Sequence, residues 1–410
     1  MKTYVLIGAG NRGYWMYADA IQNRYNDVAR LVGIMDVNSK RASYVSSRLP
    51  GNVPVYTDYN KMMDETKPDC AIIATVDKFH SEYIVRTLER GVDVISEKPM
   101  TSDAPQCNAI LDAEKRTGKN IIVTFNCRFM PLISRLKELL DTGVVGEVYS
   151  VHFEWMLDTV HGADYFRRWH RKLENCGGLL VHKSTHHFDI VNWLIGQDPA
   201  EVFANGALRV YGPNRSQRAE RCSACPHASR CEFVYPDGND PGIRGMYFDC
   251  EDEDGYYRDR CVFDSEIDIY DTMSLAVRYK QGALMTYSLI AHSPYEGWRM
   301  SISGKNGRLE ACQFDTGAQA ADPCFHIKLY DRHGGTMTYD LKKGEGSHGG
   351  GDERLLRMLF RGDVPDTLGQ FAGSRDGAMS ILIGIAANIS IKERRPVTID
   401  ELVPPEKLPD

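Results

Sequence analysis

Short apolar segments alternate with amphipathic segments along the first third of the chain. The apolar segments are residues 4–7, 29–36, 69–76, 92–99 and 120–126. Between them, as in residues 78–91, apolar positions recur every three or four places, which is the period of a helix with one buried face. Apolar strands alternating with amphipathic helices predict a parallel sheet covered by helices and joined by right-handed crossovers.

From about residue 146 the period changes from helical to strict alternation of apolar and polar positions. This period of two runs through residues 148–156, 271–279 and 283–291, and Asn306-Gly307 is typical of a hairpin turn. Helical patterns are expected at residues 129–143, 182–195, 352–361 and 374–392. Half-buried alternating strands favour a sheet with one apolar and one polar face.

The two patterns together predict two domains. We expect an α/β domain with a parallel, doubly wound sheet at residues 1–126, and an α+β domain with a large, mostly antiparallel open sheet at 127–410. A cysteine-rich insertion interrupts the second domain at about 211–262. We expect this sheet to join copies of the chain into a homo-oligomer, a dimer or a tetramer.

Composition narrows the class of protein. The 410 residues are 42% hydrophobic and 26% charged, with a net charge of −7, which is ordinary for a globular protein of two domains. Long Lys/Arg runs and 18-residue apolar spans are absent from the sequence, so neither nucleic acid nor a membrane is expected as a partner. The N-terminus enters a strand directly, and the eleven cysteines are mostly scattered. We therefore expect a cytoplasmic protein.

A glycine-rich turn joins the first apolar segment to the next helix. Residues 8–13 read GAGNRG, and Asp36 ends the second apolar segment, 36 − 13 = 23 positions after the last glycine. Such glycines let a diphosphate approach backbone N–H groups, while the carboxylate would accept ribose hydroxyls and repel a 2′-phosphate. The pattern predicts a Rossmann domain that binds NAD; the alternative is a glycine-rich turn in another doubly wound fold.

Ligands of doubly wound sheets bind at the carboxyl ends of the strands, where further polar residues of this sequence lie. The predicted cofactor-binding residues are Gly8, Gly10, Asn11, Arg12, Gly13, Asp36, Thr75, His80, Glu97, Lys98 and Asn126. For His80, capping or packing is an equally good interpretation.

Residues 177–189, GGLLVHKSTHHFD, concentrate polar side chains on a predicted helix. His182, His186 and Asp189 would share one face, and Lys183 and His187 the adjacent one. The spacing is compatible with a metal site, with a polar helix face of no function, and with a proton relay that contacts substrate. We favour the relay, because the segment lacks an HExxH arrangement.

The order of several motifs resembles the glucose–fructose oxidoreductase/inositol dehydrogenase family (Gfo/Idh/MocA) over nearly the whole chain. The motifs are the glycine-rich turn, SEKPM at 96–100, FNCRFMP at 125–131, YFRRWHR at 165–171 and the GG…H…D segment. The resemblance implies a cleft between the two domains and redox chemistry on sugars, polyols and related molecules. His182 stands where the family commonly has Asp, so His182 is the weaker candidate and His186 the stronger.

The resemblance and the chemistry together assign roles. Oxidising an alcohol requires a base for the hydroxyl proton, and a lysine beside a cationic nicotinamide should have a lowered pKa, which favours Lys98 as acid/base with His186 relaying the proton. A lysine that only forms a salt bridge with Glu97 is the alternative. The predicted substrate-binding residues are Arg128, Tyr165, Trp169, Lys183 and His187.

The predicted function is an NAD-dependent oxidoreductase acting on a hydroxyl or carbonyl of a sugar, glycoside or polyol. A glycoside hydrolase or lyase that holds NAD and oxidises its substrate transiently is the alternative with the same residues. A regulatory protein that senses nucleotides is the third class; it would be expected to lack Lys98 or His186, and both are present.

The insertion contains a cluster of cysteines. The predicted metal ligands are Cys222, Cys225, Cys231 and Cys261. Four thiolates would suit a structural zinc ion, and the neighbouring arginines would favour thiolates. An iron–sulfur cluster and a disulfide pair are the alternatives. Outside the insertion, Asp352 is interpreted as a helix cap.

Overall fold

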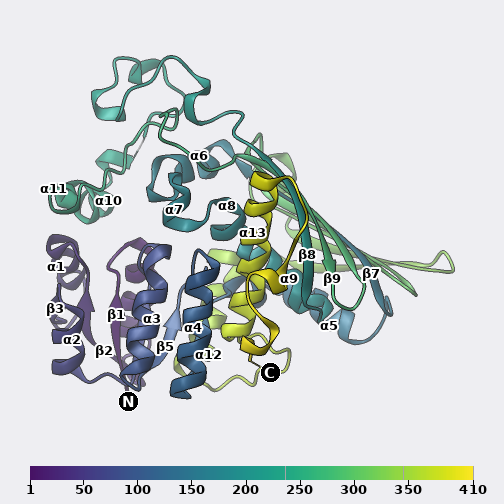
Figure 1. Ribbon diagram of the computed structural model, residues 1–410, viewed down its shortest axis with the longest axis horizontal. Helices are drawn as coiled ribbons and strands as arrows, with labels where there is room; N and C mark the ends of the chain where they lie inside the picture. The colour runs from purple at the N-terminus through teal and green to yellow at the C-terminus, as the bar shows by residue number, and fades with distance from the viewer. Residues whose placement is uncertain (236, 345, 410) are drawn as a thin grey trace.

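The first domain contains a six-stranded parallel sheet (Figure 1). The structure, a computed structural model, describes residues 1–235, 237–344 and 346–409. The strands are β1 Lys2–Ile7, β2 Ala29–Met35, β3 Val55–Tyr56, β4 Cys70–Ile73, β5 Asp93–Ser96 and β6 Ile121–Val123, in the order β3-β2-β1-β4-β5-β6. From β1 the chain adds β2 and β3 on one side and β4, β5 and β6 on the other. The carboxyl ends of β1 and β4 therefore border the crevice where ligands of such sheets bind. The predicted doubly wound sheet is confirmed.

Helices cover this sheet and begin and end at residues that suit helix termini. They are α1 Ser39–Ser47, α2 Tyr59–Thr66, α3 His80–Glu89 and α4 Ala104–Thr117, after a first helix of π type at Gly13–Ala18 and Ala20–Arg24. Asp103 accepts a hydrogen bond at the start of α4, and Gly118 ends that helix in the left-handed conformation.

The second domain contains a nine-stranded sheet with one solvent-facing side. Its order is β14-β13-β12-β11-β7-β10-β9-β8-β15, and every pairing is antiparallel except that of β7 with β10. The strands are β7 Val148–Asp158, β8 Pro199–Ala207, β9 Thr272–Tyr279, β10 Leu284–Ser293, β11 Gly297–Gly304, β12 Gly307–Phe314, β13 Cys324–Asp331, β14 Thr336–Lys342 and β15 Val397–Thr398. Residues along β9 alternate between exposed and buried, which confirms the mostly antiparallel open sheet.

Helices fill the space between the large sheet and the first domain. They are α5 Pro131–Asp141, α6 Thr159–Arg167, α7 Leu173–Cys176, α8 Leu179–His182, α9 Ser184–Ile195, α12 Gly351–Phe360 and α13 Ser374–Glu393. α12 returns to the first domain, where the ring of Phe360 contacts those of Tyr4 and Tyr25, each with centroids 5.3 Å away. The C-terminal region therefore contributes to the core of the first domain, which is called the nucleotide domain below.

The predicted helix at 182–195 is divided in two. α8 ends at His182 and α9 begins at Ser184, with Lys183 between them. The predicted helix is therefore interrupted at Lys183, whose backbone keeps a right-handed helical conformation, and His182 belongs to the shorter of the two helices.

The insertion between β8 and β9 extends over the nucleotide domain. It contains the short helices α10 Pro241–Met246 and α11 Glu251–Asp254, which lie close to α1 in Figure 1. Within the described part of the chain, no helix has the length and apolar character needed to cross a bilayer.

Candidate active site

The glycine-rich turn has the shape of a diphosphate cradle. Gly8 has φ +100°, and a Cβ there would lie 2.5 Å from the carbonyl oxygen of Ala74 on the neighbouring strand end. A Cβ at Gly13 would lie 2.2 Å from the oxygen of Gly8, so both positions require glycine. The residues present therefore fit a dinucleotide, whose diphosphate such a turn binds through its N–H groups.

Asp36 is held rigidly at the end of β2. Its Oδ2 accepts the N–H of Ala9 at 2.8 Å and its Oδ1 accepts the N–H of Asn38 at 2.9 Å. Arg41 Nη1 lies 3.3 Å from Oδ1. Burial raises the pKa of Asp36, and these donors oppose that effect. The carboxylate lies beside the glycine turn, where the ribose of a dinucleotide would meet it.

A buried network links the turn to the start of α12. Arg12 Nε donates to Glu97 Oε1 at 2.6 Å, and Tyr17 donates to the same oxygen at 2.7 Å. Asp352 accepts a hydrogen bond from Asn126 Nδ2 at 2.5 Å and lies 3.5 Å from Arg12. Gly350, not Asp352, is the N-cap of α12, so the interpretation of Asp352 as a cap was wrong. Burial alone would raise the pKa of Glu97, but Arg12 and Tyr17 lower it.

Lys98 lies against His182 of the second domain. Its Nζ donates to the carbonyl oxygen of His182 at 3.2 Å and lies 3.5 Å from the Nε2 of the same residue. The Nδ1 of His182 in turn contacts Asp77 Oδ2 at 2.6 Å. Asp77, His182 and Lys98 therefore form a chain of polar contacts across the two domains. Glu97 is paired with Arg12, which argues against Lys98 serving only as the ion-pair partner of Glu97.

Burial shifts the pKa values of Asp77, His182 and Lys98. It lowers the pKa of Lys98 to about 8, although Asp77 and Glu97 act in the opposite direction. Burial, aided by the charge of Lys98, lowers the pKa of His182 well below its usual range, so the imidazole is neutral near pH 7. Burial also raises the pKa of Asp77. Lys98 can therefore exchange a proton near neutral pH, as an acid/base residue requires.

The other strand-end residues position the loops around Lys98. His80 is buried; its Nδ1 contacts the carbonyl oxygen of Pro99 at 2.8 Å and its Nε2 that of Thr75 at 3.1 Å. Both ring nitrogens thus face backbone carbonyls of the two loops. This geometry favours the packing interpretation of His80 over direct contact with the cofactor.

A cavity of about 380 Å³ opens beside the α9 segment. His186, His187 and Lys183 line it, together with Trp155 of β7, His161 of α6 and Glu296, which directly precedes β11. The ring of His187 stacks on that of Trp155 with centroids 4.0 Å apart, and Lys183 Nζ lies 4.8 Å from the Trp155 ring centroid. Aromatic faces, imidazoles and an ammonium group suit a small hydroxylated ligand.

Two further predicted substrate residues lie around His182. The ring centroid of Tyr165 is 5.7 Å from that of His182, and that of Trp169 is 5.6 Å away. The hydroxyl of Tyr165 lies 3.1 Å from Nε2 of His161, which lines the cavity. The structure thus brings both aromatic residues to the boundary of the candidate site.

Arg128 is placed differently from its predicted role. Its guanidinium forms two hydrogen bonds with Asp189, at 2.8 and 2.6 Å, and one with Asp376 at 2.8 Å. It also donates to the carbonyl oxygen of Gly369, and the residue is only 2% exposed. Arg128 therefore joins α9 and α13 to the end of the nucleotide domain instead of lining the cavity. Because both oxygens of Asp189 accept hydrogen bonds from Arg128, this carboxylate does not serve as a metal ligand together with His182 and His186.

The predicted metal site is not supported. Cys222, Cys225, Cys231 and Cys261 line the same small cavity, but no group of three or more His, Cys, Asp or Glu residues within 1–235, 237–344 and 346–409 is arranged to hold a metal ion. Arg221, expected to favour a thiolate, forms ion pairs with Asp259 and Glu251. Burial raises the pKa of Cys222.

Two residues of this region escaped the sequence analysis. Asp77 follows β4 by a few residues, so the rule that selected Thr75 and His80 could have found it. Tyr247 of the insertion accepts the N–H of Asn11 at 2.9 Å, across 236 positions of sequence. A contact between residues so far apart along the chain cannot be recognised from a local sequence pattern.

Comparison with known proteins covers both domains. Residues 2–125 match the model described as "Oxidoreductase family, NAD-binding Rossmann fold", and residues 137–399 match "Oxidoreductase family, C-terminal alpha/beta domain", both of the Gfo/Idh/MocA group. The chain is 37% identical to "Putative oxidoreductase YteT" of Bacillus subtilis, over 98% of this chain and 99% of that protein. It is 21% identical to the myo-inositol 2-dehydrogenase of Thermotoga maritima, over 92% and 93% of the two chains.

A solved structure supports the same fold. The WlbA dehydrogenase of Bordetella pertussis, in complex with NADH and UDP-GlcNAcA, superposes with a TM-score of 0.66 at 18% identity, over 96% of this chain and 98% of that one.

Replacing Arg128 with Met should lower the free energy of unfolding by about 3–5 kcal/mol, because Asp189 would remain buried without its partner. Chemical denaturation measures this change. Arg135→Met is the matched control: Arg135 forms an exposed pair with Glu138, so its loss should cost about 0–1 kcal/mol. If Arg128→Met were as stable as the unaltered chain and had a raised KM, the predicted role of Arg128 in substrate binding would be supported instead.

Proposed function

Because this chain belongs to the Gfo/Idh/MocA oxidoreductase family, we propose that it is an NAD-dependent dehydrogenase or reductase acting on a hydroxyl or carbonyl carbon of a sugar, glycoside or polyol. Relatives named inositol 2-dehydrogenase, and a fold neighbour bound to a nucleotide sugar, support this substrate class. The position of Lys98 carries the proposal: its amine lies at the carboxyl edge of the parallel sheet, with a pKa of about 8, against His182.

When bound, NAD would supply the hydride acceptor. The glycine turn would bind its diphosphate and Asp36 its ribose hydroxyls. Thr75, Glu97 and Asn126 follow β4, β5 and β6 at the carboxyl edge of the sheet and would complete the proposed cofactor site.

Lys98 would remove the hydroxyl proton of the substrate. The carbonyl oxygen of His182 holds the Nζ by one hydrogen bond, so a neutral amine keeps its lone pair for the substrate. His182 is positioned by Asp77, while His186 lies in the cavity wall. His186 would bind the reacting hydroxyl and relay its proton to or from Lys98. Lys183, His187, Tyr165 and Trp169 would contact the rest of the substrate.

The experiment that tests the function is a screen of sugars, glycosides and polyols for NADH formation. Release of a free sugar without net NADH would instead identify a hydrolase or lyase that keeps its NAD and oxidises the substrate transiently. Binding of NAD with no turnover of any compound would favour a regulatory role.

The rate of substrate oxidation should depend on Lys98 and on pH. kcat/KM should rise as pH increases through about 8, because only the neutral amine can accept a proton. Lys98→Met should lower turnover by about 10² to 10⁴ and abolish that inflection. Asp77→Asn should move the inflection to lower pH, since the Asp77 charge raises the pKa of Lys98. An unchanged profile in Lys98→Met would exclude Lys98 as the base.

The relay can be tested in the same assay. His186→Ala should lower turnover as Lys98→Met does, and the double variant should be little worse than either, because residues that act as one unit are not additive. Additive losses would contradict the relay and leave His186 as a separate substrate contact.

Cofactor preference should depend on Asp36. Asp36→Ala should lower the affinity for NAD about 10-fold through loss of a charged hydrogen bond. It should also raise the affinity for NADP, because Asp36 would no longer repel a 2′-phosphate and Arg41 would lose one of its two acidic partners. Calorimetric titration with both cofactors measures the change. Tighter binding of NADP than NAD by the unaltered chain would contradict the assignment.

The solvent-facing side of the large sheet supports a homo-oligomer. Phe203 on β8 and Leu284 and Ile290 on β10 are 44%, 54% and 38% exposed. Phe203 lies opposite Ala276 of β9, and Thr286 of β10 lies opposite the same residue from the other side. Exposed large apolar side chains on β8 and β10, on the two sides of β9, suit contact with a second copy of the chain, as a dimer or within a tetramer.

Adding charge at these side chains should dissociate the assembly. The double variant Phe203→Lys/Leu284→Lys should sediment as a monomer, because burying two unpaired ammonium groups in the contact would be costly. Val364→Lys, on a loop outside the sheet, is the control and should sediment as the unaltered chain does. An unaltered chain that is already monomeric would remove the proposal.

A further inference from the structure

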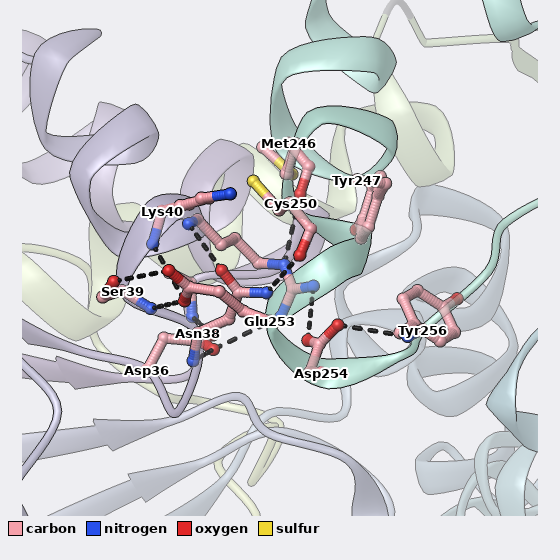
Figure 2. Close-up of polar contacts among 12 residues, drawn as sticks. Asp36, Asn38, Ser39, Lys40, Met246, Tyr247, Cys250, Glu253, Asp254 and Tyr256 are labelled. Atoms are coloured by element: carbon pink, nitrogen blue, oxygen red, sulfur yellow. Dashed lines mark hydrogen bonds and ion pairs between the residues drawn. The ribbon is translucent and has the colours of Figure 1, made fainter.

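The insertion is fixed onto the edge of the nucleotide domain that contains Asp36. Figure 2 shows residues of α10 and α11 facing the loop after β2. Ser39 donates through its N–H and its hydroxyl to Glu253, at 2.6 and 2.8 Å, and Asn38 Nδ2 donates to the carbonyl oxygen of Cys250 at 2.8 Å. Arg41 Nη2 donates to Asp254 at 2.7 Å. These contacts hold the insertion beside the predicted ribose site.

Tyr247 reaches from this docked insertion to the glycine turn itself. Its hydroxyl accepts the N–H of Asn11 at 2.9 Å and would lie 3.8 Å from a Cβ at Gly10. Asn11 N–H is one of the donors that such a turn offers to a diphosphate. A tyrosine hydroxyl both accepts and donates, so once a phosphate oxygen takes the N–H, Tyr247 can donate its own proton to that phosphate.

A buried arginine, Arg258, lies against Tyr247, and its own polar contacts are long. The guanidinium carbon of Arg258 is 4.8 Å from the Tyr247 ring centroid, and the Arg258 side chain is 9% exposed. Its distance to Asp164 is long, 4.0 Å, because Arg168 takes the other oxygen of that carboxylate at 2.8 Å. Its hydrogen bonds to Tyr235 and Tyr256 are also long, at 3.3 and 3.4 Å.

Two of the arginines near Tyr247 share a single ion-pair partner among the described residues. Arg41 is balanced by Asp36 and Asp254, whereas Arg168 and Arg258 share the carboxylate of Asp164 and repel each other. Buried charge is costly unless it is paired. The pair of Arg168 and Arg258, whose second member lies against the Tyr247 ring, therefore carries one positive charge more than Asp164 supplies in negative charge, which suits an anion.

We propose that the insertion completes the cofactor site, with Tyr247 and Arg258 binding the diphosphate of NAD from the side opposite the glycine turn. This inference rests on the proposed function, since it assumes that the turn binds NAD. The diphosphate meets the charge of Arg258, which Asp164 pairs only at 4.0 Å, and the contacts of Ser39, Asn38 and Arg41 hold the insertion in place over the bound dinucleotide.

The test compares binding of NAD, ADP-ribose and adenosine to the full chain by calorimetry. Arg258→Gln should weaken NAD and ADP-ribose by about 10- to 100-fold, the usual effect of losing a charged hydrogen bond. Tyr247→Phe should weaken both by about 5- to 20-fold. Adenosine, which has no diphosphate, should bind every variant within about twofold of the unaltered chain if the loss arises at the phosphates.

Arg260→Gln and Tyr257→Phe are the matched controls. Arg260 and Tyr257 lie in the same segment and contact each other, at 5.4 Å, rather than Tyr247. Both variants should bind all three ligands as the unaltered chain does. Thermal denaturation confirms folding, and Tyr247→Phe, which removes one oxygen, keeps the test decisive if Arg258→Gln unfolds.

Three outcomes would overturn the inference: unchanged NAD affinity in Tyr247→Phe and Arg258→Gln, tighter NAD binding by Tyr247→Phe, or an equal loss for adenosine. Tighter binding would mean that the hydroxyl competes with the cofactor, and an equal loss would mean that the residues only maintain the fold. Failure of the unaltered chain to bind NAD would reject the proposed function itself, and this inference with it.

Discussion

The ion pairs of Arg128 fix the segment that follows the parallel sheet against two helices of the second domain. Arg128 follows the last strand of the parallel sheet, and its guanidinium is shared by a carboxylate of α9 and one at the start of α13. α9 also carries His186 and His187, so this side chain helps to hold the helix that lines the cavity. Three elements distant in sequence are held together by directional bonds, where apolar packing alone would allow them to slide.

Within that frame, the environment of Lys98 is unusual because a neutral imidazole lies beside it. A carboxylate at the position of His182 would attract a proton to the lysine and raise its pKa. Here the nearest acid, Asp77, is one imidazole away, and burial prevails, so the pKa of Lys98 falls to about 8. The substitution that made His182 seem the weaker candidate is thus compatible with an acid/base role for Lys98.

The sequence contained enough information for the fold and for the polar residues that follow the strands of the parallel sheet. Glycine spacing, strand periodicity and the rule that ligands meet strand carboxyl ends depend on local order along the chain, and they located the turn, Asp36, Glu97 and Lys98. The break at Lys183 and the role of Arg128 depend on tertiary packing, which periodicity cannot express. The cysteine spacing suggested a metal site, yet spacing alone does not determine whether side chains converge.

The ends of the insertion lie next to each other on the large sheet. β8 ends at Ala207 and β9 begins at Thr272, and these two residues are register partners. A segment whose ends are already adjacent can be lengthened, shortened or replaced at small entropic cost to the surrounding sheet. Evolution, or a designer, can therefore exchange this segment as a cassette and alter how firmly a cofactor is retained while the residues around Lys98 stay the same.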